Sequence, residues 1–264
     1  MSLRLKVILF MLAFSISFFL SLYFIADKII IQNFKTLEVQ STTRNLDRAE
    51  KALEARIRQL EVFATDYAVW DDTYQFVKDQ NDKYIKATLI NQTFENSKIN
   101  LMIILDKEGK QLFAKAYDFE KDQPLLLPQG LLEHLNPDDL LINHANTEGV
   151  SGLLVLPNEI ILISSQSITT SDKEMPSNGT FIMGRYLDQE EQAQLKETAN
   201  LDIEFVPYKN KQELSMIDNV DDFLQHKTAI KEIDQNQIVG YKIKDDIYGD
   251  PQLITKITST RDIY

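Results

Sequence analysis

The pattern of apolar and polar residues divides the chain into three kinds of segment. Val7 to Ala26 form an apolar run without a single charged residue. From about Ile29 to Tyr67 there is neither glycine nor proline, and apolar residues recur every three or four positions, as on one face of a helix. After Ser97 the period changes to that of strands. The pattern therefore predicts a membrane helix, a long helix and then a largely antiparallel sheet, an α+β fold.

The apolar run is long enough to cross a membrane, since about 20 residues at 1.5 Å each span a hydrocarbon core of about 30 Å. Arg4 and Lys6 precede it, which predicts a cytoplasmic N-terminus and an exported remainder. A cleavable signal peptide is the alternative, but its apolar region is about 7–15 residues and ends in a small-x-small site. We expect residues 1–28 to be an uncleaved anchor and residues 29–264 an extracytoplasmic, periplasmic domain at the inner (cytoplasmic) membrane.

The glycine-free segment carries an apolar stripe that two kinds of packing would explain. The helix can pack on its own domain, or it can continue the membrane helix as the seam of a parallel dimer, and seven positions are too few to decide. The stripe consists of Leu46, Ala49, Leu53, Ile57, Leu60, Ala64 and Tyr67.

Shorter elements follow. Asp72-Thr-Tyr-Gln75 fits a capping box, so Asp72 is predicted to be a helix N-cap, and Asn81 or Asp82 to begin a helix through about Thr93. Hairpins are expected where strand-like runs flank turns containing glycine or proline. The remaining predicted elements are a hairpin of Ile99–Asp106 with QLFAKAYD, a helical segment Leu125–His144, a hairpin of Gly152–Leu156 with Glu159–Ile168, the strand GTFIMGRYL, a helix Asp188–Asn200, and strands Ile203–Tyr208, Thr228–Ile233, Ile238–Lys244 and Gln252–Thr260.

Composition excludes several functions. The 40 acidic residues outnumber the 28 basic ones, a net charge of −12, which argues against nucleic acid as a partner. The absence of cysteine excludes disulfides, thiolate catalysis and cysteine-based metal sites. His134, His144 and His226 lack metal-ligand spacing, and no nucleotide-binding or nucleophile motif is present. We therefore expect no catalytic residues, no metal and no cofactor.

One stretch, DYAVWDDTYQFV from Asp66 to Val77, concentrates aromatic and acidic side chains around the single tryptophan. Its aromatic residues share a helix face, which fits either a core stripe or the wall of a ligand pocket. Asp71 and Asp72 point about 100° apart on a helix, so capping or solvation explains them better than acid–base catalysis. Arg185 is either a pocket guanidinium or the partner of Asp66, Asp71 or Asp72. The candidate ligand-binding residues are Tyr67, Trp70, Asp71, Asp72, Tyr74 and Arg185.

The same stretch resembles the signature of the fourth subtype of the CHASE family, extracellular sensors attached to cyclases and histidine kinases. The segments LDKEG, EGVSGLLVL, ISSQSITTSD and NGTFIMGRYLDQ follow in the order that this family shows. The final YKIKDDIYGDPQLITKITSTRDIY resembles the last strands before the second membrane helix of such receptors. The resemblance covers roughly Lys28 to Tyr264.

The resemblance implies a PAS-like, Cache-type sensor with a ligand-sized hollow, followed by a second membrane helix and a cytoplasmic diguanylate cyclase or histidine kinase. Because the chain stops at Tyr264, we expect a fragment of a longer receptor. The hypothesis is a homodimeric membrane sensor that binds a small ligand or stimulus and signals across the membrane. The alternative is a membrane-anchored partner-binding or structural module without a small-molecule site. The resemblance supplies no catalytic residues.

Overall fold

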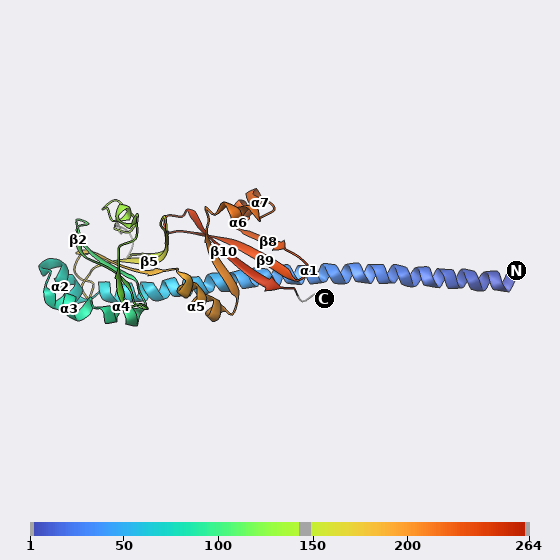
Figure 1. Ribbon diagram of the computed structural model, residues 1–264, viewed down its shortest axis with the longest axis horizontal. Coiled ribbons are helices and arrows are strands. Elements are labelled where there is room, and N and C mark those ends of the chain that lie inside the picture. Colours follow the sequence, from blue (N-terminus) through green and yellow to red (C-terminus); the bar gives the residue numbers. More distant parts are fainter. Residues whose placement is uncertain (1–2, 143–148, 262–264) are drawn as a thin grey trace.

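The computed structural model describes residues 3–142 and 149–261 and is dominated by one helix, α1 (Leu3–Ala68) (Figure 1). Because no glycine or proline interrupts it, α1 continues without a break from the apolar run into the amphipathic stretch, over about 100 Å. Its apolar segment is wholly exposed and is the one span in the described residues that is long and apolar enough to cross a membrane.

Two antiparallel sheets lie one after the other along α1, where the sequence predicted a single sheet (Figure 1). The six-stranded sheet, here the distal sheet, packs near the C-terminal end of α1 in the order β3-β2-β1-β6-β5-β4. The four-stranded sheet, here the proximal sheet, lies nearer the apolar segment in the order β7-β10-β9-β8. The strands are β1 (Leu101–Asp106), β2 (Gln111–Asp118), β3 (Gln123–Leu125), β4 (Gly149–Val155), β5 (Ile160–Ser167), β6 (Gly179–Tyr186), β7 (Asp202–Pro207), β8 (Thr228–Glu232), β9 (Gln237–Asp245) and β10 (Pro251–Thr260).

Both predicted hairpins and the three C-terminal strands are confirmed, with bounds that differ by at most three residues. The helix α5 (Gln189–Ala199) is also confirmed, with the Asp188 side chain accepting from the backbone N–H groups of Glu190 and Glu191. This helix leads the chain from the distal to the proximal sheet and packs beside α1. The division into two sheets therefore occurs at α5.

The apolar stripe of α1 packs on the chain's own sheets. All its members are buried except the half-buried Tyr67, and they share one core with residues of both sheets, including Phe181 and Leu253. The packing of this helix on its own domain is thereby confirmed. The alternative, that this stripe is a dimer seam, is wrong because its surface is already covered.

Three short helices follow α1: α2 (Asp71–Asp79), α3 (Asp82–Thr88) and α4 (Asn91–Ser97). The prediction that Asp72 is an N-cap is wrong, because the extended residue Trp70 is the N-cap and makes no side-chain cap hydrogen bond. Asp72 instead lies in the first turn of α2, where a carboxylate interacts favourably with the helix dipole. Asn81 does cap α3, accepting from Tyr84 N at 2.9 Å. That helix ends at Thr88 and not at Thr93.

The helical segment predicted over Leu125–His144 is wrong for its described part. That part contains the end of β3 and one 3₁₀ turn, η1 (Leu131–His134), because prolines at 128 and 137 interrupt it. His144 itself lies outside the described residues. Two short helices that the sequence analysis missed, α6 (Lys211–Ser215) and α7 (Val220–His226), precede β8.

The last described residue, Arg261, returns the chain to α1. Its guanidinium donates to both carboxylate oxygens of Glu38, each at 3.0 Å, and its side chain is 6% exposed. The guanidinium also pairs with Glu232 at 3.0 Å. The end of β10 is thus held against α1 about a dozen residues beyond the apolar run.

Candidate functional site

The aromatic residues of the Trp70 stretch form a cluster where α1 ends on β6. The Trp70 ring lies 4.8 Å from that of Tyr67, which lies 5.9 Å from the ring of Phe181. Tyr74 is buried, with the Lys78 ammonium 4.3 Å from its ring centre, whereas Trp70 is 42% exposed. The cluster packs on one side and faces solvent on the other.

Polar groups of this stretch form hydrogen bonds with the loop that joins β5 to β6. Asp71 Oδ1 accepts from the backbone N–H of Ser171 at 2.9 Å, and the Asn178 side chain donates to Tyr74 O at 3.3 Å. The five candidate residues from 67 to 74 line none of five cavities in the described residues. Their role as ligand contacts therefore stays a prediction.

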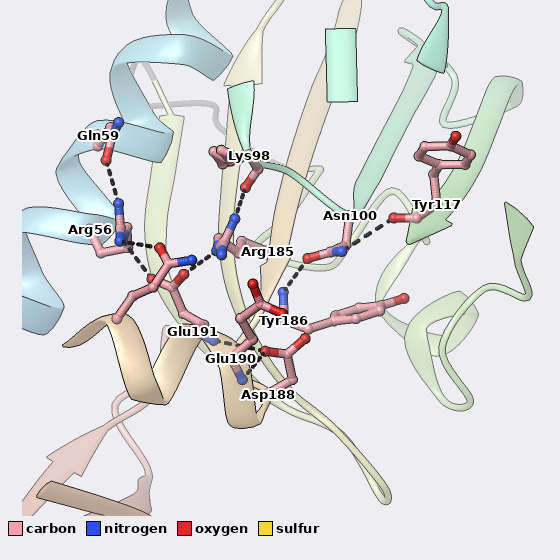
Figure 2. A network of polar contacts seen from close by, with 11 residues as sticks. Arg56, Gln59, Lys98, Asn100, Tyr117, Arg185, Tyr186, Asp188, Glu190 and Glu191 are labelled. Carbon is pink, nitrogen blue, oxygen red and sulfur yellow. Dashed lines mark hydrogen bonds and ion pairs between the residues drawn. The ribbon is translucent and has the colours of Figure 1, made fainter. Parts of the chain in front are cut away.

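Arg185 lies elsewhere, in a buried network between α1, β6 and α5 (Figure 2). Its Nε pairs with Glu191 Oε2, and a terminal nitrogen donates to Lys98 O at 2.6 Å. The other oxygen of the fully buried Glu191 carboxylate lies 2.5 Å from Arg56 Nε. The predicted pairing of Arg185 with Asp66, Asp71 or Asp72 is wrong for this reason.

The structure does not bring Arg185 together with Trp70. Arg56, beside Arg185, precedes Tyr67 on α1 by 11 residues, which is roughly 16 Å along the helix. A hollow of only about 10 Å³ adjoins Arg185, too small for a ligand. The geometry makes Arg185 a partner in an internal ion-pair network.

An acidic rim adjoins this network at the start of α5. Desolvation, together with the neighbouring carboxyl of Glu190 and the charge of Asp188, raises the pKa of Glu120 to about 7. Arg185 opposes this shift only weakly, since the guanidinium is already paired with Glu191. Glu120 therefore changes charge near neutral pH. The described residues contain no group of three or more histidine, aspartate or glutamate side chains arranged to hold a metal ion.

A larger hollow lies where the two sheets meet, and we call it the junction cavity. Its volume is about 610 Å³, within the range typical of small-molecule sites. The distal sheet contributes the ends of β4, β5 and β6, and the proximal sheet contributes β7 and β10. The lining residues are Val155, Leu156, Pro157, Asn158, Glu159, Ile160, Tyr186, Leu187, Asp188, Gln192, Phe205, Pro207, Lys209 and Gln252.

A second cavity of about 460 Å³ adjoins the first and shares Asn158, Glu159 and Tyr186 with it. Glu159 Oε2 is buried and has no hydrogen-bond partner among the described residues. Burial raises the pKa of the Glu159 carboxyl, and burial together with the Glu159 charge raises the pKa of Tyr186, so the two side chains lie close together.

Sequence reasoning missed this site because Pro157-Asn158 was interpreted only as a hairpin turn and Glu159 only as the first residue of a strand. One signal was available. Glu159 is the single charged residue between Gly152 and Ser167, in an otherwise apolar or uncharged hairpin.

A family model supports the resemblance seen in the sequence. The model of the CHASE4 domain matches residues 52–206, which run from α1 into β7. The chain belongs to the CHASE4 family. As a CHASE4 domain it is a sensory domain of signal transduction, and strands β8 to β10 lie beyond the matched part.

Among curated proteins, the chain is similar to the methanogenesis regulatory histidine kinase FilI of Methanothrix harundinacea. The two are 29% identical over 212 residues, which is 80% of this chain and 23% of FilI. The CHASE4 chain therefore spans about a quarter of that kinase's length.

Two solved structures share its fold. One is the extracellular domain of vpHK1S-Z8, a proposed histidine kinase, with a TM-score of 0.54 and 13% identity over 86% of this chain and 97% of that one. The other is the periplasmic domain of Vibrio cholerae LuxQ, with a TM-score of 0.51 and 13% identity over 83% of this chain and 99% of that one. At this identity the likeness establishes the fold, a long helix followed by Cache-type, PAS-like sheets, which confirms the predicted fold class.

Proposed function

We propose that this CHASE4 domain is the extracytoplasmic input part of a membrane receptor. Residues 1–28 anchor it with the N-terminus in the cytoplasm, and residues 29–264 receive a small ligand or another stimulus. The signal passes to a cytoplasmic histidine kinase or diguanylate cyclase. The observation that carries the proposal is the unbroken α1, which joins the apolar segment to both sheets.

The same helix supplies the mechanism. A ligand that prefers one arrangement of the sheets on α1 shifts the equilibrium by its differential affinity for the two arrangements. Arg261 holds the end of β10 against Glu38 of α1. A displacement of the proximal sheet would therefore move α1 and the C-terminal end of the described chain together.

We further propose that the receptor works as a homodimer. The apolar side chains of Ile30, Phe34 and Leu37 remain exposed beyond the apolar run, and the last two lie beside the ends of β9 and β10. Their spacing of four and three residues is that of a coiled-coil seam. Cross-linking of a Phe34→Cys variant in membranes tests this arrangement, and a monomeric result would contradict it.

Topology can be tested directly because the chain has no cysteine. A cysteine replacing the exposed Ala87 should react with a membrane-impermeant maleimide in intact cells. A cysteine replacing the exposed Leu3 should react only after permeabilisation. The reverse pattern would overturn the proposed orientation.

Ligand input can be tested on residues 35–264, which we expect to fold without the apolar run. A compound at 100 times its dissociation constant stabilises a protein by about 2.7 kcal/mol, a visible shift in melting temperature. A hit lost in a folded Trp70→Ala or Asp72→Asn variant would support recognition by the Trp70 stretch. A blank library with a folded domain would favour the partner-binding module instead.

A further inference from the structure

Both sheets contribute to the lining of the junction cavity. Leu156 and Ile160 come from the distal side, and Phe205 and Gln252 from the proximal side. A molecule bound there would contact both sheets at once. Its affinity would therefore depend on how the two sheets are placed relative to each other.

One carboxylate of the lining also carries an unused hydrogen-bond acceptor. Glu159 Oε2 is buried without a partner among the described residues, and a buried carboxylate oxygen without a donor is costly. Tyr186 also lines the cavity, and its hydroxyl makes no hydrogen bond with Glu159 Oε2 in the described structure. A turn of the Glu159 carboxylate toward the cavity would bring Oε2 within reach of a ligand donor, which would remove that cost.

Charge and shape narrow the class of ligand. Two carboxylates, Glu159 and Asp188, line the cavity against one exposed lysine, Lys209. Asp188 is occupied in capping α5, which leaves Glu159 as the carboxylate available for recognition. The remaining walls are largely apolar, with Leu156, Ile160, Phe205 and two prolines among them.

We propose that the junction cavity binds a small organic ammonium ion, with its N–H groups donating to Glu159 and its carbon body against the apolar walls. A charge-assisted hydrogen bond of this kind is about twice as strong as a neutral one. The proposal deepens the proposed sensory function by naming a ligand class and a site. Binding is measured without any signalling readout. A failure to bind the amine would therefore contradict the ligand site and leave the proposed sensory function untouched.

The test uses the full chain in detergent micelles and isothermal titration with n-butylammonium, with butyrate as a matched anion of similar size. We expect saturable binding of the amine and none of butyrate. Glu159→Gln keeps the shape of the side chain and removes its charge, so the amine affinity should fall by at least about tenfold. Glu174→Gln, at an exposed position outside the cavity, should leave it unchanged.

A second variant keeps the test decisive if Glu159→Gln fails to fold. Lys209→Gln removes the one positive charge of the lining, so the amine should bind about two- to tenfold more tightly. No amine binding, equal binding of butyrate, or an affinity that Glu159→Gln leaves unchanged would overturn the proposal. Weaker amine binding by Lys209→Gln would overturn it as well.

Discussion

The two sheets are attached to α1 by different kinds of contact. At the distal sheet, one fully buried carboxylate, Glu191, lies between two guanidiniums above an apolar core. At the proximal sheet, Lys242 and Lys244 of β9 reach acidic residues of α1 in partly exposed ion pairs, such as Lys244–Glu54 at 2.8 Å.

The difference has a physical consequence. Buried pairs are little screened by salt, whereas the attraction between exposed charges weakens as added salt shortens the Debye length. Although partial burial works the other way, the two lysines hold the pKa of Glu50 below its usual range. Along β9 the proximal sheet therefore has the more adjustable attachment to α1, whereas the end of β10 is held by the nearly buried Arg261–Glu38 pair.

Glu191→Gln would break the distal attachment and should have the largest effect. It leaves the buried Arg185 charge and the partly exposed Arg56 charge without their carboxylate partner, which costs about 3–5 kcal/mol of unfolding free energy. Thermal unfolding followed by circular dichroism measures it. Glu197→Gln, on the exposed face of the same helix, should stay within about 0.5 kcal/mol. Equal effects of the two variants would contradict the buried-pair interpretation.

Gly240→Ala would push the proximal sheet away from α1. A Cβ at this position of β9 would lie 2.7 Å from Thr42 Cγ2 and 3.0 Å from Leu46 Cδ1. We expect a loss of about 1–3 kcal/mol, with faster hydrogen exchange in β8 to β10 than in the distal sheet. Adding Thr42→Ser removes the methyl group in closest contact and should restore part of the loss. Uniformly faster exchange in both sheets would argue against separate attachments.

Lys242→Gln should distinguish the two attachments, because its loss of unfolding free energy should depend on salt. The lysine pairs with Asp47 at 2.9 Å and with Glu50, and its side chain is 25% exposed. The variant should lose about 0.5–1 kcal/mol at low ionic strength and almost nothing at 1 M salt, where the Debye length is about 3 Å. The Glu191→Gln loss should persist at 1 M salt. If the losses caused by Lys242→Gln and Glu191→Gln depended equally on salt, the two sheets would not differ in how they are attached to α1.

Glu120→Gln should have the smallest effect and reports on the acidic rim at α5. The pKa of Glu120 is raised to about 7, so the folded chain favours the protonated carboxyl and loses stability as pH rises from about 5 to 8. The glutamine variant lacks that loss. Its melting temperature should match the wild type near pH 5 and exceed it at pH 8. A constant difference across this range would show that the carboxyl does not titrate there.

The secondary structure followed closely from the sequence where local patterns decide it. The stripe from Leu46 to Ala64, the cap at Asp188 and the alternation of QLFAKAYD each depend on residues a few positions apart. The exact start of a helix depends on the backbone conformation of a single residue, which the sequence pattern does not determine. The extended conformation of Trp70 moved the start of α2 by two residues and removed the cap predicted at Asp72.

The amino-acid sequence by itself determined the membrane-length helix, its continuity with the sensor helix, the strand order along the chain and the CHASE4 signature. Only the tertiary structure decided that the strands form two sheets, that Arg185 pairs with Glu191, and that Glu159 and Phe205 line one cavity. Periodicity and capping are set by neighbours within a few residues. Partners brought together by the packing of distant elements leave no local pattern from which they could be predicted.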